Sequence, residues 1–136
     1  MGYRHKVQYY ETDQMGIVHH SNYIRWFEEA RTYWLEKIGC GYKEMEAMGV
    51  ISPVLSVKAE YKSMTHFYDE VDINVTVVHY NGVKIVLHYE VTDLQTGEVR
   101  CVGESSHCFL EKEGRIISLK KEFPQIHKLM EQTKEV

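Results

Sequence analysis

Polar and apolar residues alternate with a period of two along much of the second half of the chain, which predicts β-strands. In the first such run the odd positions, such as Leu55 and Val57, are mostly apolar, and we expect them to face a core. The dipeptide Asn81-Gly82 is a strong hairpin signal between two of the runs. The expected strands are residues 51–62, 71–77, 83–91 and 98–110.

An earlier segment, residues 22–38, follows the helical period instead. Its polar residues are spaced three or four apart on one narrow stripe, namely Arg25, Glu29, Thr32 and Glu36. The rest of the circumference is mostly apolar, so we expect other elements to surround this helix over most of its girth. Ser21 or Asn22 can cap its start and Gly39 can end it. A first strand (3–10), a short helical piece (42–48) and a C-terminal helix (123–134) complete the expected elements.

The order of these elements predicts an α+β fold. A long antiparallel sheet with one apolar face needs a cover, and only the early helix is apolar enough to provide it. We therefore expect a single domain, residues 1–136, in which a curved antiparallel sheet wraps around a long central helix. The outer face of the sheet is also partly apolar, which indicates self-association; it carries Val54, Val78, Val86 and Val102.

The composition excludes several classes of function. A net charge of -4 without basic tracts gives no electrostatic basis for binding nucleic acid or an anionic membrane. The cysteines, Cys40, Cys101 and Cys108, are odd in number and lack a CxxC pair, so we expect buried free thiols. The polar N-terminus does not match a signal peptide, and no segment is long enough to span a membrane. We expect a cytoplasmic protein without a membrane partner.

The candidate chemistry lies in the stretch YYETDQMGIVHHSNYIRWFEEAR, residues 9–31. Asp13 lies on a turn just before the long helix. The backbone N–H groups at a helix start are unpaired donors, and the helix dipole there favours negative charge. A carboxylate beside such donors can serve as a base or nucleophile facing an oxyanion site. The alternative is that Asp13 only accepts a hydrogen bond within an Asx turn.

Other polar residues carry weaker signals. Adjacent histidines such as His19 and His20 chelate a metal poorly, so we expect no metal and a polar lining for the helix start. Glu28 and Arg31 are spaced to satisfy each other on the helix. His66 can line a ligand entrance or lie on the surface. The chain lacks a G-x-S-x-G elbow and nucleotide-binding glycine motifs, and we expect no cofactor.

The same stretch resembles the signature of hotdog-fold acyl-CoA thioesterases, most closely the 4-hydroxybenzoyl-CoA thioesterase family with its bacterial short-chain acyl-CoA relatives. The resemblance implies a sheet wrapped around the helix and hydrolysis of an acyl-CoA substrate. It also implies a homodimer or homotetramer with sites at the subunit interfaces. The matching residues are Thr12-Asp13, Gly16, Val18-His19-His20, Asn22-Tyr23, Trp26 and Glu28 to Arg31.

The resemblance implies specific roles for these residues. Asp13 matches the catalytic aspartate, and His20 matches the residue whose backbone N–H binds the thioester carbonyl. Lys62 and Lys84 are candidates for the coenzyme A phosphates. The remaining expected substrate-binding residues are Gly16, His19, Asn22, Tyr23 and His66. Tyr23, with Trp26 and Phe27, can instead belong to the core.

Three questions stay open from the sequence. Asp13 can attack the carbonyl directly or activate water. A hotdog-fold dehydratase acting on hydroxyacyl thioesters would need His19 or His20 paired with Glu28 as general base and acid. The chain could also be an acyl-CoA-binding module without turnover, and the presence of Asp13 counts against this alternative.

Overall fold

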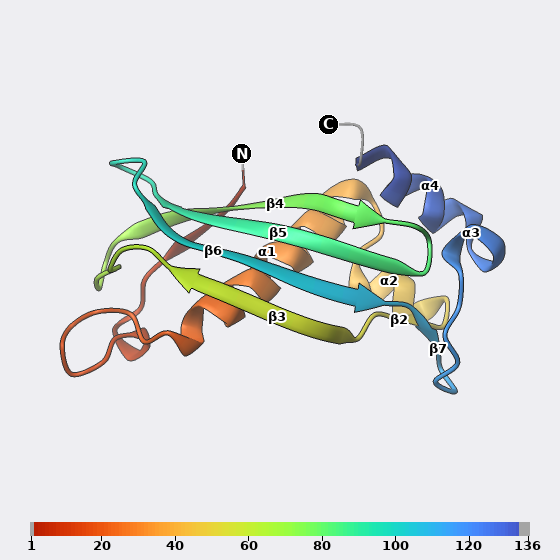
Figure 1. Cartoon of the computed structure of the whole chain (residues 1–136), viewed down its shortest axis with the longest axis horizontal. Coiled ribbons are helices and arrows are strands. Elements are labelled where there is room, and N and C mark those ends of the chain that lie inside the picture. The colour runs from red at the N-terminus through yellow and green to blue at the C-terminus, as the bar shows by residue number, and fades with distance from the viewer. Residues whose placement is uncertain (1, 134–136) are drawn as a thin grey trace.

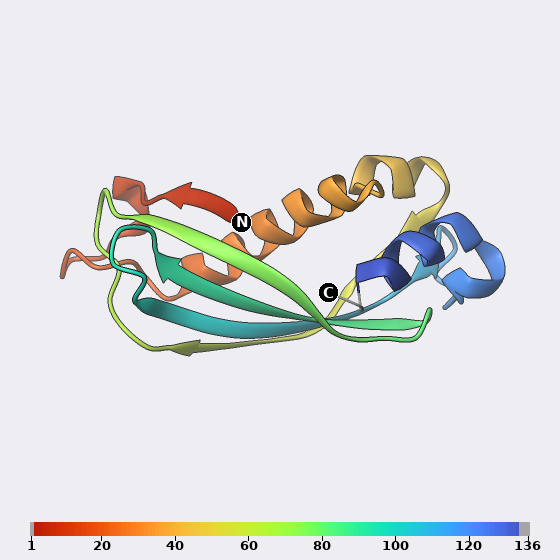
Figure 2. The same ribbon diagram turned by 90° about the horizontal axis from the view of Figure 1, so that it is seen from above.

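The computed structural model describes residues 2–133, which form a five-stranded antiparallel sheet packed against a long helix, α1 (Ser21–Ile38). The strand order is β1-β4-β5-β6-β3. The sheet curves over one side of α1 (Figure 1), and the view from above shows α1 and the C-terminal helix on the same face (Figure 2). The predicted α+β hotdog architecture is confirmed. The strands are β1 (Tyr3–Lys6), β3 (Val54–Tyr61), β4 (Glu70–Tyr80), β5 (Lys84–Asp93) and β6 (Val99–Cys108).

Short elements gather near the C-terminal end of α1 (Figure 1). A two-stranded sheet joins β2 (Val50–Ile51) to β7 (Leu110–Glu111). The helices there are α2 (Tyr42–Ala47), α3 (Leu119–Glu122) and α4 (Pro124–Thr133). The C-terminal helix was expected with Pro124 in its first turn, and it begins at that residue, where a missing N–H costs nothing. Its expected last residue, Lys134, lies outside the described residues.

Three of the expected strands were too long. The first strand ends at Lys6, because residues 9–11 form a 3-10 helix, η1 (Tyr9–Glu11). The run 51–62 divides around Pro53, which has no N–H to donate to a ladder, into β2 and β3. The run 98–110 divides at Phe109 into β6 and β7, which pair with different strands.

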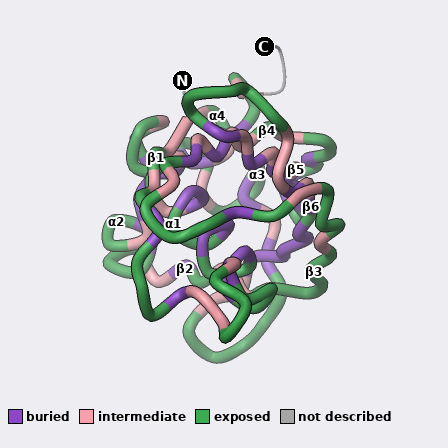
Figure 3. Tube along the Cα trace, turned by 90° about the vertical axis from the view of Figure 1, so that its left-hand side faces the viewer, coloured by how far each residue is buried: buried purple, intermediate pink, exposed green. Residues whose placement is uncertain are grey.

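The core lies between α1 and the inner face of the sheet, and the buried segments gather in the middle of the molecule (Figure 3). Trp26 and Phe27 are fully buried, and the Phe27 ring stacks on Tyr89 with centroids 4.5 Å apart. Gly103 permits this approach, since a Cβ there would lie 2.3 Å from the Phe27 ring. The prediction that other elements surround most of the girth of α1 is wrong for the single chain. The sheet covers one side, which leaves Ile24 exposed.

Strand β3 departs furthest from its expected burial. Leu55 and Val57 were expected to face a core, but they are 54% and 42% exposed. The reason is position, because β3 lies at the edge of the sheet and pairs only with β6 among the described strands. Helix α1 contacts β3 where Tyr23 meets Tyr61, but it leaves Leu55 and Val57 exposed. The alternation predicted the strand correctly but not what covers it.

Two other expectations concern the cysteines and membrane spans. All three cysteines are free and buried, as predicted. None of the helices within residues 2–133 combines the length and the hydropathy needed to cross a membrane.

Candidate functional site

The loop of residues 12–20 connects η1 to α1 and folds back on itself as a tight hairpin. The N–H of Asp13 donates to the carbonyl of Ile17 at 2.8 Å, and the backbones of Thr12 and Val18 form an isolated antiparallel β-bridge. Gly16 turns the chain with φ +79°, in the left-handed region that favours glycine. Asp13 and His20 therefore lie on opposite arms of one loop.

The side chain of Asp13 has two different environments for its two oxygens. Oδ1 accepts the N–H of Met15 at 2.8 Å, which is the Asx turn considered from the sequence. Oδ2 has no hydrogen-bond partner among the described residues. Asp13 is half-buried and lines a hollow of about 440 Å³ between this loop and the end of β3. The turn therefore leaves one carboxylate oxygen available to a bound molecule.

The start of α1 leaves one backbone N–H without a partner. The helix cap is His20, not Ser21 or Asn22 as expected; its own side chain makes no capping hydrogen bond, whereas Nδ1 of His19 accepts the N–H of Ser21 at 3.3 Å. The N–H groups of Asn22 and Tyr23 donate to the carbonyls of His19 and His20 at 3.0 and 3.3 Å. Within residues 2–133 the N–H of His20 has no hydrogen-bond partner. It is a donor at the positive end of the helix dipole.

Aromatic and apolar side chains form the walls of the hollow. The rings of Tyr23 and Tyr61 lie 5.3 Å apart, and Tyr61 also contacts the ring of His20. Tyr23 donates to Oγ1 of Thr65 at 2.9 Å, and its burial raises the pKa of the phenol. Tyr23 thus belongs both to the core and to a wall of the hollow. The lining residues are Asp13, Met15, Ile17, Val18, His19, His20, Tyr23, Tyr61, Lys62, Ser63 and Met64.

The structure brings together most of the expected site residues. Asp13, His19, His20, Tyr23 and Lys62 line the hollow, and Gly16 lies in the turn between two lining residues.

Three expected residues are placed differently. His66 is exposed, and its backbone forms an isolated antiparallel β-bridge with Ile17, which lines the hollow. Asn22 is buried, and its side-chain N–H groups donate to the carbonyls of Glu11 and His19. Lys84 is the first residue of β5, which starts at the opposite end of the sheet from the loop (Figure 1). Within one chain Lys84 does not reach the hollow.

The sequence did not identify two residues that shape the hollow. Tyr61 is one of the odd, mostly apolar positions of the run 51–62, and only its place at the end of an edge strand puts it in the wall. Arg100 stabilises the neighbouring wall, since its guanidinium donates to Ser63 Oγ at 3.1 Å and to Asp93 at 2.9 Å. The hydrogen bond from Arg100 keeps the pKa of Asp93 below its usual range. No local motif indicates either contact.

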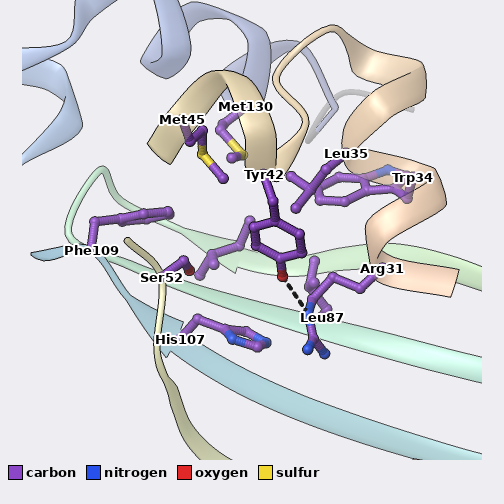
Figure 4. A pocket seen from close by; sticks show the side chains of 11 residues that line it. Arg31, Trp34, Leu35, Tyr42, Met45, Ser52, Leu87, His107, Phe109 and Met130 are labelled. Atoms are coloured by element: carbon purple, nitrogen blue, oxygen red, sulfur yellow. Dashed lines mark hydrogen bonds between the residues drawn. The ribbon is translucent and has the colours of Figure 1, made fainter. Parts of the chain in front are cut away.

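A second polar cluster lies in the core, away from this hollow (Figure 4). The expected Glu28–Arg31 ion pair is present at 4.0 Å, although Glu28 is exposed. Arg31 also donates to the hydroxyls of Tyr42 at 2.8 Å and Tyr89 at 3.0 Å, and these shorter contacts are its hydrogen bonds. Helical spacing could not predict the contact with Tyr89, because Tyr89 lies on β5 and not on the helix.

The cluster continues from Tyr89 through Ser105 to His107, over contacts of 2.6 and 2.8 Å. Burial, with a smaller effect of the Arg31 charge, lowers the pKa of His107 to about 4. Among the described residues Glu28 makes no hydrogen bond to His19 or His20, so these residues do not form the His–Glu pair considered for a dehydratase. They also contain no group of three or more His, Cys, Asp or Glu side chains placed to hold a metal.

Comparison with known proteins places these features in a family. The profile of the thioesterase-like superfamily matches residues 7–133. A putative acyl-CoA thioesterase of Bacillus subtilis, YneP, is 38% identical over 130 residues, which cover 95% of this chain and 94% of that protein. A putative esterase of Aquifex aeolicus is 35% identical over 126 residues, 93% of this chain and 96% of its own length.

A solved structure extends the likeness to three dimensions. The DHNA-CoA thioesterase of Staphylococcus aureus superposes with a TM-score of 0.91 at 30% identity, over 98% of this chain and 89% of that one. The resemblance found in the sequence stretch 9–31 therefore extends over nearly the whole chain.

Proposed function

This chain belongs to the thioesterase-like superfamily, and we propose that it hydrolyses an acyl-CoA thioester to a free acid and coenzyme A. One observation carries the proposal. Asp13 and His20 line the same hollow, and among residues 2–133 neither Oδ2 of Asp13 nor the N–H of His20 has a hydrogen-bond partner. A base or nucleophile and an oxyanion donor are the two groups that thioester hydrolysis requires.

The chemistry follows from the roles of these two groups. The carbonyl oxygen of the thioester accepts the His20 N–H, where the helix dipole stabilises developing negative charge. Asp13 removes a proton from a water molecule whose oxygen attacks the carbonyl carbon, and the C–S bond breaks to release coenzyme A as a thiolate. Direct attack by Asp13 would instead give a mixed anhydride that water then hydrolyses. A general base contributes about 10²–10⁴ in rate and one oxyanion donor about 10²–10³.

The walls of the hollow indicate how the substrate is held. Tyr23, Tyr61 and the thioether of Met64 offer an apolar surface to an acyl group. Lys62 is an exposed ammonium at the rim, 3.2 Å from Glu60, and is our candidate for a coenzyme A phosphate. The matched relatives are named for acyl-CoA and DHNA-CoA thioesterases, which supports coenzyme A as the carrier.

We also propose that the working form is a homodimer, or a homotetramer built from such dimers. Strand β3 has an unpaired edge among the described strands and carries exposed Leu55 and Val57. Unpaired edges favour pairing with another chain. Tyr61, the last residue of β3, lines the hollow, so a second copy on this edge would lie next to the site. A cytoplasmic location, and the absence of nucleic-acid and membrane partners, stay predictions from the sequence.

The test follows thiol release from short, medium, long and aromatic acyl-CoAs by the native protein and by Asp13→Asn. We expect turnover of at least one substrate and a loss of at least about a hundredfold in the variant, within the range of a general base. Equal activity of a folded variant would remove Asp13 from the mechanism. Binding of acyl-CoA without thiol release from any substrate would favour the binding-module alternative.

A further inference from the structure

Glu11 is a buried carboxylate two residues before Asp13, and it is only 4% exposed. Its Oε1 accepts the N–H of Gln8 at 2.8 Å and lies 2.8 Å from Nε2 of His5. Its Oε2 accepts the indole N–H of Trp26 at 2.8 Å. Burial alone would raise the pKa of Glu11, but these hydrogen bonds outweigh it and keep the pKa below its usual value. A buried carboxylate with three polar partners is held in one position.

The backbone of Glu11 closes the base of the loop that carries the site. Its carbonyl accepts the N–H of His19 at 2.9 Å and the side-chain amide of Asn22 at 2.9 Å. The first of these bonds joins the two arms of the loop, and the second ties their junction to the first turn of α1. Asp13 lies two residues from this junction on the side of the turn, and His20 lies one residue from it on the side of α1.

We propose that Glu11 is a positioning residue, which fixes the carboxylate of Asp13 relative to the backbone N–H of His20. The inference rests on the proposed function and deepens it. Glu11 does not line the hollow, so it acts through the loop and not on the substrate. A displacement of reacting groups by 1 Å can cost about 10² in rate. Small shifts of this junction therefore affect turnover.

The variant Glu11→Gln tests the role of the charge with little change in shape. A carboxylate only accepts hydrogen bonds. The NH₂ group of glutamine would face one of the donors from Gln8, His5 or Trp26 and could not accept its hydrogen bond. We expect kcat to fall by about tenfold or more, while KM changes by less than about threefold, because the walls of the hollow are untouched.

Glu29→Gln is the matched control. Glu29 is another carboxylate near His5, at 3.6 Å, and it accepts the hydroxyl of Tyr3 at 2.7 Å without contacting the loop. We expect its kcat and KM to stay within about twofold of the native values. An equal loss in this control, a loss in KM instead of kcat, or a folded Glu11→Gln variant with native kcat would overturn the proposal.

If the Glu11→Gln protein does not fold, a second variant and a second measurement still test the proposal. Trp26→Phe removes one donor to Glu11 and retains an aromatic ring, and we expect a lower kcat with KM unchanged. A native kcat in a folded Trp26→Phe protein would overturn the proposal. Hydrogen exchange of the His19 N–H, measured in a folded variant, reports the loop junction without any need for activity. We expect faster exchange when Glu11 is altered or loses this donor, and native exchange would contradict the role.

Asp13→Asn, measured in parallel, separates this inference from the proposed function. If the native protein releases no thiol, or Asp13→Asn is fully active, the proposed function fails, and exchange of the His19 N–H still decides the role of Glu11. If Asp13→Asn is inactive and Glu11→Gln is folded and fully active, only the positioning role fails.

Discussion

One oxygen of the Asp13 carboxylate accepts the N–H of Met15 at 2.8 Å, while the side chain also lines the hollow beside α1. The residue therefore shapes its own loop and presents a second oxygen to a bound molecule. Asparagine can keep the turn contact, because its side-chain oxygen also accepts hydrogen bonds, whereas alanine cannot. The two substitutions separate the local structural role from the chemical one.

We expect Asp13→Asn to retain the native free energy of unfolding to within a few tenths of a kcal/mol, since the turn contact survives. Asp13→Ala should lose about 1 kcal/mol, the net value of one hydrogen bond. Both variants should lose thioesterase activity. Urea unfolding together with thiol release measures the two effects. Equal destabilisation by Asn and Ala would show that the turn contact does not stabilise the loop.

The backbone N–H of His20 can be removed without breaking any hydrogen bond among the described residues. His20 has φ -55°, close to the value that proline imposes, so His20→Pro suits the local backbone. We expect His20→Pro to lower kcat by about 10²–10³, as for the loss of one oxyanion donor. His20→Ala keeps the N–H and should lose only a few-fold in kcat.

Circular dichroism and unfolding curves would establish that the His20→Pro protein is folded before its rates are compared. A strong loss in His20→Ala would assign the role to the imidazole instead of the amide. Full activity of a folded His20→Pro protein would exclude the amide as the oxyanion donor.

The exposed inner side of β3 predicts where two copies meet. Val57→Lys places a charge on this apolar edge strand, and we expect it to convert the assembly to monomers and to reduce activity. Val78→Lys is the matched control, because Val78 is also exposed but lies on β4. Sedimentation velocity should find dimers for Val78→Lys, even if the native protein forms tetramers. Monomers with Val78→Lys and intact dimers with Val57→Lys would place the interface elsewhere.

The contacts of Arg31 predict unequal effects for two residues of one helix. Arg31→Met leaves the partly buried hydroxyl of Tyr42 without its charged donor and removes a buried donor to Tyr89, and we expect it to cost about 2–4 kcal/mol of stability. Glu28→Gln should change stability by less than about 0.5 kcal/mol, since Glu28 is exposed and its ion pair with Arg31, at 4.0 Å, is screened by water. Equal losses in denaturant unfolding would show that the Glu28–Arg31 ion pair contributes as much as the hydrogen bonds of Arg31 to the tyrosines.

His107 makes stability depend on mildly acidic pH. Its pKa is about 4 in the folded chain and near 6.5 in an unfolded one, so the unfolded chain binds a proton first as the pH falls. The free energy of unfolding should therefore decrease between about pH 6.5 and pH 4, by on the order of 3 kcal/mol.

Unfolding of His107→Asn across the same pH range is the comparison, since this variant should lack most of that decrease. An identical pH dependence of the two proteins would show that His107 is not held neutral by burial. The carboxyls of Glu11 and Asp93 have the same sign of effect at lower pH. Their lowered pKa values stabilise the fold above the usual carboxyl range, and this contribution is lost as the pH falls further.

The sequence by itself determined what depends on neighbours along the chain. The period of two predicted the strands, and the spacing of Arg25, Glu29 and Thr32 predicted α1 to within a residue of its start. Asp13, Gly16 and the histidines before the helix are also local, because a turn followed directly by a helix start brings them together. Element ends were less accurate, since Pro53 and η1 interrupt runs that continue in the hydrophobic pattern.

Only the tertiary structure decided what joins distant parts of the chain. Arg31 bonds to Tyr89, 58 residues away, because α1 crosses the middle strands, and no spacing rule reaches that far. Lys62 lines the hollow while Lys84 lies at the other end of the sheet, although both were equal candidates in the sequence. Strand β3 has the alternation of a half-buried strand, yet its place at the sheet edge leaves its apolar side uncovered. Local periodicity encodes the type of an element, whereas the order of strands determines its neighbours.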